Sequence, residues 1–265
     1  MKESLSSTFS VPEAYERYIG RWSARLAPGF LSFAGARDGE RLLDVGCGTG
    51  SLSLALAAAA PSAEIEGIDP SSPFVEYARS RPNAGRIKFS VGDAQALPYP
   101  DNAFDRSLAM LVFNFIPDPA KGLSEMRRVT RSGGVVATAV WDHFGGMKML
   151  RTFWSVVDEI DPTADGENQP TFAKDSMYEM FVHGGLQDVR AEELWISTDF
   201  ASFDDYWSPF LGGQGPGGRY VASLTPERRE VLRQALRERV LGSKPDEAFS
   251  FGARAWAVRG VVPEA

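Results

Sequence analysis

Three glycines at alternate positions, Gly46, Gly48 and Gly50, come directly after the apolar segment 42–45. A glycine has no Cβ atom, so it can adopt a positive φ and lets a ligand approach the backbone closely. The helix expected after Gly50 would present unpaired N–H groups and a partial positive charge at its first turn. Residues 42–50 therefore predict a turn from strand to helix that can bind the carboxylate or phosphate group of a ligand.

Two acidic residues follow later apolar segments, and each suits a different part of a nucleoside. Asp69 ends the second segment, where its carboxylate can accept hydrogen bonds from both ribose hydroxyls. Asp93 and Ala94 follow the third segment, where a carboxylate beside a backbone N–H suits the edge of an adenine ring. Because the carboxyl ends of parallel strands meet at one edge of a sheet, these residues predict a single ligand crevice.

The glycine spacing distinguishes two classes of cofactor. The dinucleotide fingerprint has the order G-x-G-x-x-G, which would place its third glycine at position 51. Ser51 occupies that position. A nicotinamide cofactor is therefore disfavoured, and an NAD-dependent oxidoreductase remains the weaker alternative.

The elements that must position these residues alternate between apolar and helical segments from 41 to 142, the pattern of βα units in a parallel sheet. An amphipathic stripe over 11–26 predicts a helix that packs over the sheet edge. After 142 we expect helices at 147–160 and 174–183, with a polar loop at 161–170 between them. The expected strands are 41–45, 64–68, 87–91, 105–112, 135–140, 189–196 and 248–261, and helices are expected at 51–60, 72–81 and 119–130.

An insertion, 199–247, separates the last two expected strands. Its glycine-rich part, 212–218, predicts a flexible connection or a moving lid. Thr225 and Pro226 have the residue types of an N-cap and a first helical residue, so a long helix should follow. Four aromatic residues fit a core or a substrate pocket equally well: Phe203, Tyr206, Trp207 and Phe210. The buried side of the long helix should be formed by four apolar residues: Val231, Leu232, Leu236 and Val240.

The chain resembles the class I S-adenosylmethionine-dependent methyltransferases, in particular the small-molecule branch of the ubiquinone and menaquinone biosynthesis enzymes. The resemblance implies an α/β, Rossmann-like fold: a seven-stranded, mostly parallel sheet with helices on both faces and an antiparallel last strand, plus the N-terminal helix and the helical insertion. It implies one domain over 1–265, with a helical cap at 1–40, a cofactor core at 41–142 and a substrate side at 143–265. The residues that carry it are 42–50, Asp69, 92–98, Phe104, Asp105, 115–118 and 131–134.

The resemblance also implies the roles of individual residues. Segment 18–23 resembles one that covers the cofactor in some relatives, so Arg21 is expected to meet the methionine carboxylate. By position in the family pattern, the methionine end would be held by Asp44, Gly46, Cys47, Gly48 and Gly50, the ribose by Asp69 with Pro70, and the adenine by Asp93 with Ala94.

A general base is less clearly indicated. Many relatives have histidine after the fourth strand, where this chain has Phe113-Asn114-Phe115. His143, just past the fifth strand, is the first candidate catalytic base, and Asp142 is the second. We expect Cys47 to be a small buried residue rather than a nucleophile. His183 fits a helix end better than a catalytic position.

The composition of the chain limits the classes of partner that it is expected to bind. A net charge of −7 argues against a nucleic-acid substrate, because phosphate contacts need clustered Lys and Arg. A single cysteine fits a reducing compartment, and the sequence has neither a signal segment nor a membrane span, so a cytoplasmic protein without membrane insertion is expected. The oligomeric state stays open. The prediction is methyl transfer from S-adenosylmethionine to a small or medium-sized organic acceptor, by O- or C-methylation. The main alternative is a non-catalytic protein that binds S-adenosylmethionine or a nucleotide.

Overall fold

The computed structural model describes residues 11–143, 145–164 and 172–264, and a seven-stranded sheet lies at its centre. The strand order is β3-β2-β1-β4-β5-β7-β6; the first five strands pair in parallel, and β7 is antiparallel to both of its neighbours. The predicted fold class is confirmed. The strands are β1 (Arg41–Val45), β2 (Glu64–Asp69), β3 (Lys88–Val91), β4 (Phe104–Met110), β5 (Thr130–Trp141), β6 (Gln187–Phe200) and β7 (Phe249–Val261).

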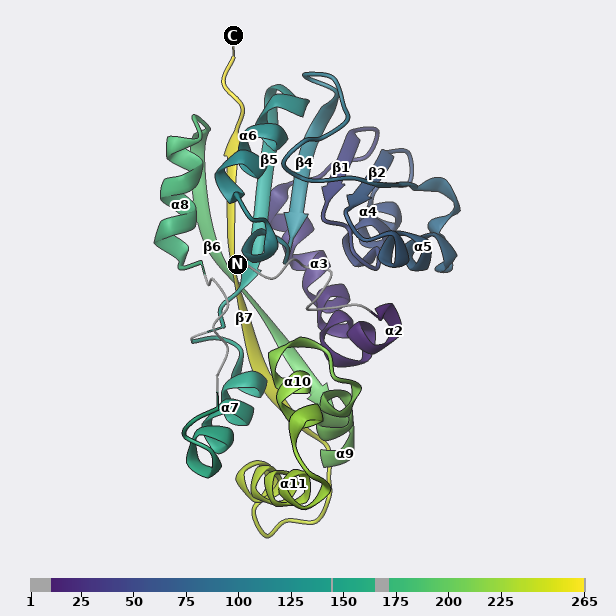
Figure 1. The fold of residues 1–265 in the computed structure, drawn as a ribbon. Coiled ribbons are helices and arrows are strands. Elements are labelled where there is room, and N and C mark those ends of the chain that lie inside the picture. The colour runs from purple at the N-terminus through teal and green to yellow at the C-terminus, as the bar shows by residue number, and fades with distance from the viewer. Residues whose placement is uncertain (1–10, 144, 165–171, 265) are drawn as a thin grey trace.

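Helices cover both faces of this sheet (Figure 1). One face packs against α3 (Arg21–Ala34), α4 (Ser51–Ala59) and α5 (Ser72–Ser80). The other packs against α6 (Pro119–Val129) and α8 (Lys174–His183). The chain moves outward in one direction from β1 to β3 and in the other from β4, so the order of the strands reverses between β1 and β4. Ligands of open α/β sheets bind at such a reversal.

Several strand boundaries differ from the prediction: β6 runs from Gln187 to Phe200 rather than over 189–196, and the end of β4 and the start of β5 also differ. The fourth strand was expected to reach residue 112, but Leu111 has a positive φ of 65° and ends β4 at Met110. The fifth was expected to start at residue 135, but β5 begins at Thr130 and passes through Gly133 with φ 69°. In both places backbone geometry, rather than hydrophobicity, sets the boundary.

The N-terminal segment is a bent helical cap. It consists of α2 (Pro12–Tyr15), the π-helical turn η1 (Glu16–Gly20) and α3. The helix predicted over 11–26 therefore continues to Ala34. It also lies elsewhere than expected: α3 contacts β4, β5, β6 and β7 across the face of the sheet rather than covering an edge.

Strands β6 and β7 extend past the other strands of the sheet and carry a smaller lobe, seen in the lower part of Figure 1. Aromatic rings fill it, and Phe203, Tyr206, Trp207 and Phe210 are all buried. These four residues are therefore core residues. The lobe consists of α7 (Lys148–Ile160), α9 (Phe203–Trp207), η4 (Ser208–Gly212), α10 (Gly215–Ser223) and α11 (Pro226–Leu241).

Two predictions for this lobe are corrected. Residues 215–218 of the glycine-rich segment form the first turn of α10, Gly212 ends η4, and only 213–214 connect the two. The glycines permit close packing: a Cβ atom on Gly218 would lie 2.9 Å from the backbone of Gly213. In α11, which Thr225 caps as predicted, Val231 is 54% exposed although it was expected on the buried side. Residues 165–170 of the predicted polar loop lie outside the described residues.

Candidate functional site

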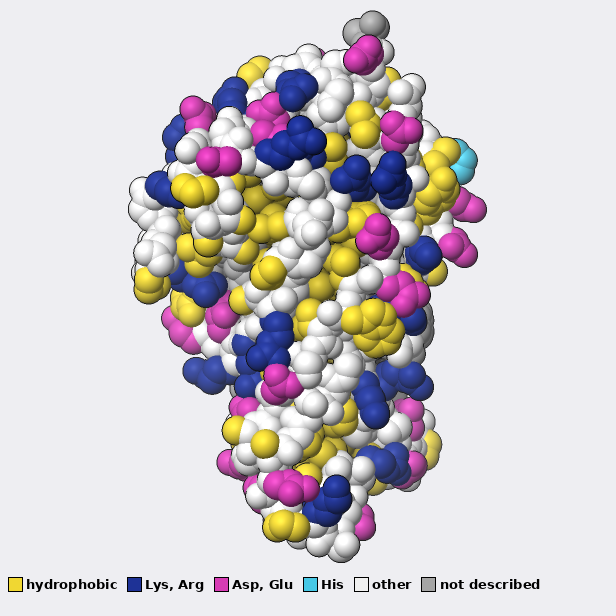
Figure 2. All heavy atoms as spheres, turned by 180° about the vertical axis from the view of Figure 1, so that it is seen from behind, with side chains coloured by type: hydrophobic (Ala, Val, Ile, Leu, Met, Phe, Trp, Pro, Cys, Tyr) yellow, Lys and Arg dark blue, Asp and Glu magenta, His cyan; other side chains and the backbone are white. Residues whose placement is uncertain are grey.

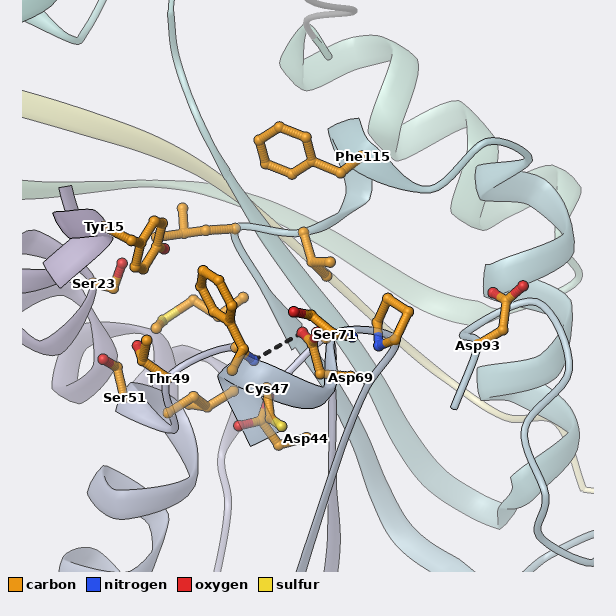
Figure 3. Close-up of a pocket in the computed structure, with 18 of the residues that line it drawn as sticks. Tyr15, Ser23, Asp44, Cys47, Thr49, Ser51, Asp69, Ser71, Asp93 and Phe115 are labelled. Atoms are coloured by element: carbon orange, nitrogen blue, oxygen red, sulfur yellow. Dashed lines mark hydrogen bonds between the residues drawn. The ribbon is translucent and has the colours of Figure 1, made fainter. Parts of the chain in front are cut away.

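A crevice of about 330 Å³ lies at the carboxyl ends of β1 and β2 and beside the end of β4, where the strand order reverses. Figure 3 shows Asp69 near its centre, Asp44 and Cys47 on one side, and Tyr15 and Phe115 opposite them. The structure thus brings together residues from the cap, the glycine turn and three strand ends. Of the residues predicted to hold a cofactor, seven line this crevice: Asp44, Gly46, Cys47, Gly48, Asp69, Pro70 and Asp93.

The glycine turn has the conformation that its sequence predicts. Gly46 and Gly48 have φ values of 71° and 51°. A Cβ atom on Gly46 would lie 2.4 Å from a methyl carbon of Val112, so the approach of the next loop also requires glycine. The N–H groups of Gly46 and Cys47 both donate to the carbonyl of Ile68, which ties the turn to β2.

Two predicted residues, Gly50 and Ala94, are not among those that line the crevice. Gly50 has φ 84° and precedes α4; a Cβ atom there would lie 3.2 Å from the Cβ of Ala78, so Gly50 allows α4 to approach α5. Ala94 is buried in the hydrophobic core on the other face of the sheet. Gln95, which the sequence analysis did not single out, lines the crevice instead.

Asp69 is held by two backbone groups. Its carboxylate accepts hydrogen bonds from the N–H of Gly48 at 2.9 Å and of Ser71 at 2.9 Å. A carboxylate has about four lone-pair sites, so it can accept further bonds from a ligand. Asp69 is 8% exposed, and burial raises the pKa of its carboxyl above the usual range. The two N–H donors partly offset this rise in pKa.

Asp44 lies beneath the glycine turn and is fully buried. The hydroxyl of Ser53 donates to its carboxylate at 2.6 Å. Burial raises the pKa of Asp44 to about 7. Burial, with the nearby Asp44 carboxylate, also raises the pKa of the Cys47 thiol well above its usual range, so the thiol stays protonated as expected of a non-nucleophilic residue.

The cap closes one side of the crevice. The ring of Tyr15 meets the ring of Phe74 edge to face at 5.4 Å between centroids. The Thr49 hydroxyl donates to the Glu16 carboxylate at 2.5 Å, and Arg81 lies 3.9 Å from the same oxygen. Tyr15 and Phe74 were not predicted as site residues, since apolar positions on amphipathic helices look the same whether they face a core or a ligand.

Arg21, predicted to contact the methionine carboxylate, and Asp142, the second candidate base, each form an ion pair within the protein. The guanidinium of Arg21 pairs with Asp205 at 2.8 Å and lies over the Trp22 ring, and Arg21 is not among the residues that line the crevice. Its predicted contact with a methionine carboxylate is therefore not supported. Asp142 pairs with Arg254 at 2.6 Å and lines neither the crevice nor the smaller cavity beside it.

His143 lies beside the crevice rather than in it. It lines a second, smaller cavity, and that cavity shares Tyr15, Leu111 and Phe115 with the crevice. Leu111, the residue with positive φ, therefore stands between the two spaces. His183 is the last residue of α8, as expected.

The fold and the crevice define a class of protein: a Rossmann-like α/β domain with two buried carboxylates around a glycine turn at its topological switch point. Residues 43–138 match the family model described as the methyltransferase domain. The match assigns this segment, rather than the whole chain, to a methyltransferase domain.

Relatives and a solved structure agree with this assignment. The chain is 38% identical over 97 residues to a demethylmenaquinone methyltransferase of Thermus thermophilus, covering 36% of this chain and 44% of the relative. It is 28% identical over 224 residues to a sterol 24-C-methyltransferase of Gibberella zeae, covering 82% of this chain and 55% of the relative. The matched segments thus span about half the length of these curated relatives.

The structural comparison extends over most of the chain. A phosphoethanolamine N-methyltransferase of Haemonchus contortus, solved with phosphomonomethylethanolamine and S-adenosylhomocysteine, has a TM-score of 0.58 at 17% identity. The match covers 96% of this chain and 57% of that one. At this level of identity the likeness shows a shared fold.

Proposed function

We propose that this protein transfers the methyl group of S-adenosylmethionine to a small or medium-sized organic acceptor, by O- or C-methylation. The observation that carries the proposal is the crevice: the buried carboxylates of Asp44 and Asp69 flank a glycine turn at the ends of adjacent strands. Both lie within the segment 43–138 that matches the methyltransferase domain.

The residues present fit this cofactor. Asp69 would accept hydrogen bonds from the ribose hydroxyls, and Asp93 with Gln95 would flank the adenine. Asp44 would face the ammonium group of the methionine end. Helix α4 has no side-chain cap, and the hydroxyl oxygen of Ser51 in its first turn is buried without a partner among the described residues. The first turn of α4 can therefore bind the methionine carboxylate.

The bound cofactor supplies a methyl group on a positively charged sulfur, which a nucleophile can displace without protonation of the leaving group. The protein must then chiefly orient the acceptor and exclude water. Orientation can contribute about 7 to 11 kcal/mol, whereas a general base adds about 10² to 10⁴ in rate. His143 is the proposed base, because its cavity adjoins the crevice. If the His143→Ala variant keeps full activity across pH, His143 is not the base.

Charge and membrane criteria support a small-molecule acceptor. On the face shown in Figure 2, Lys and Arg side chains are interspersed with Asp and Glu rather than gathered in one basic band. With the net charge of −7 this disfavours a nucleic-acid acceptor. Among the described residues, no helix has the length and apolar character needed to cross a bilayer. The single buried cysteine supports a cytoplasmic location.

A calorimetric titration tests the proposal. S-adenosylmethionine and S-adenosylhomocysteine should bind, and Asp69→Asn should weaken both by about tenfold or more, since charge-assisted hydrogen bonds to the ribose would be lost. Asp175→Asn, an exposed position on α8, is the matched control. Protection of the protein by NADH and not by S-adenosylmethionine would favour an oxidoreductase. Binding without transfer of labelled methyl to any acceptor would favour the non-catalytic alternative.

A further inference from the structure

Leu111 has a backbone conformation that its residue type disfavours. Its φ of 65° lies in the left-handed region, where the Cβ atom of an L-residue is crowded by the backbone. The other non-glycine residues with positive φ in the described part of the chain are Asn83, Asn102 and Asp188. Asparagine and aspartate tolerate this region, whereas leucine rarely adopts it. Leu111 is therefore the strained member of this group.

The positive φ changes the face of the sheet on which the Leu111 side chain lies. Successive side chains along a strand point to opposite faces. In β4, Leu108 and Met110 belong to the core on the face covered by α3, and Ala109 belongs to the core on the face covered by α6. Continued alternation would send Leu111 to the α6 face. Instead Leu111 packs against the core on the α3 face, the face that carries the cap, and Val112 lies in the other core.

In this position Leu111 belongs to a wall between two spaces. Three residues, Tyr15, Leu111 and Phe115, line both the crevice and the smaller cavity beside it. The N–H of Leu111 donates to the carbonyl of Ala139 in β5 at 2.7 Å. The shared wall is therefore anchored to the sheet at Leu111.

The strain at Leu111 calls for an explanation. Residues in sparsely populated backbone regions persist only where the surrounding structure enforces them, and they cluster at functional sites. Glycine would relieve the strain, and this chain has glycine at other positions of the crevice with positive φ, namely Gly46 and Gly48. A leucine at position 111 therefore indicates that the side chain itself is used.

We propose that Leu111 is a specificity-determining residue that limits the size of the group transferred from the sulfonium. Its side chain lies against the methyl group of S-adenosylmethionine at the junction of the two spaces and leaves no room for a larger alkyl group. The inference rests on the proposed function, because it takes the crevice as the site of the methyl donor and the adjoining space as the side from which the acceptor approaches.

The test is calorimetric titration of the full chain with S-adenosylmethionine, S-adenosylethionine and S-adenosylhomocysteine. The second compound has one more methylene on the sulfonium, and the third has no transferable group. The wild type should bind S-adenosylethionine about tenfold more weakly than S-adenosylmethionine, because the extra methylene must displace packed atoms. Leu111→Ala should lose most of this discrimination and keep its affinity for S-adenosylhomocysteine. Equal affinity of the wild type for the two sulfonium compounds, or unchanged discrimination in Leu111→Ala, would overturn the inference.

A second pair of variants tests the backbone conformation. Glycine is less stable than alanine inside a helix, and this order reverses where φ is positive. Leu111→Gly should therefore have a higher Tm than Leu111→Ala. The control is Val231, an exposed residue of α11, where the glycine variant should have the lower Tm and both variants should keep the wild-type discrimination. A lower Tm for Leu111→Gly than for Leu111→Ala would contradict the proposal, whereas failure of the wild type to bind either S-adenosylmethionine or S-adenosylhomocysteine would count against the proposed function.

Discussion

Asp44 is a buried residue of the crevice whose ionisation is coupled to stability. In the folded protein burial raises its pKa to about 7, whereas an aspartate in an unfolded chain has a pKa of about 3.9. Between these values the folded state holds a proton that the unfolded state has lost. Stability therefore falls as pH rises through this window and stays lower above it, by up to about 4 kcal/mol.

We therefore expect Asp44→Asn to raise the Tm of the cofactor-free protein at about pH 8 and to change it much less at about pH 4, where the folded carboxyl is protonated and the unfolded one is about half protonated. The same variant should bind S-adenosylmethionine more weakly, since the ammonium group loses its anionic partner. Thermal unfolding across pH measures the first effect, with Asp175→Asn as control. A difference in Tm that does not vary with pH would show that Asp44 is not buried in its ionised form.

At the residue scale, the sequence predicted site residues correctly where the backbone conformation requires a particular residue type. Gly46 and Gly48 need positive φ, and Asp69 ends a strand beside them, so spacing alone predicted their place in the crevice. Arg21 could not be placed in this way, because its partner, Asp205, is far away in the sequence and lies in the insertion. Long-range pairs of this kind leave no local pattern.

Among the elements, the cap depends on a small set of polar contacts. Glu16 connects η1 to Thr49 in the glycine turn and to Arg81 at the end of α5. Glu16→Ala should release η1 from the turn and speed dissociation of S-adenosylhomocysteine about fivefold, the effect of one hydrogen bond of about 1 kcal/mol. Stopped-flow displacement measures the rate.

Glu13→Ala is the matched control for this prediction, since Glu13 is an exposed residue one helical turn earlier. Its dissociation rate should equal that of the wild type. If both variants release the cofactor at the wild-type rate, the cap does not limit dissociation.

Element types were predictable from periodicity, whereas some boundaries and one loop were not. Continuous apolar runs identified β1 and β5, but no hydrophobic pattern signals that Leu111 adopts positive φ and ends β4. The segment 212–218 looked flexible because glycine is common in loops. Here Gly217 and Gly218 instead let α10 pack closely against η4, which only the tertiary structure reveals.

On the scale of the whole molecule, Phe210 joins three parts of the structure. Its ring stacks on Phe153 of α7 at 4.3 Å and meets Tyr18 of the cap edge to face at 5.4 Å. Phe210→Ala should destabilise the protein by about 3 to 5 kcal/mol, measured by denaturant unfolding. The neighbouring Leu211 is 49% exposed, so Leu211→Ala should have little effect. Equal losses in the two variants would contradict the role of Phe210 as a shared core residue.

The plan of the whole molecule was predictable mainly through its resemblance to a family. Local patterns do not specify strand order, and the antiparallel direction of β7 came from the family pattern. The length of β7 was predicted, but β6 was expected to end at residue 196 and continues to Phe200, since it is a half-exposed strand with few consecutive apolar residues. This extension creates the smaller lobe.

The position of Tyr15 has a consequence for the kinetics of the proposed reaction. Because Tyr15 belongs to the wall of both the crevice and the smaller cavity, we expect an acceptor lying against it to cover the methyl donor. The donor would then enter first and its demethylated product would leave last. The steady-state rate law would have a compulsory order, with S-adenosylhomocysteine competing against S-adenosylmethionine alone.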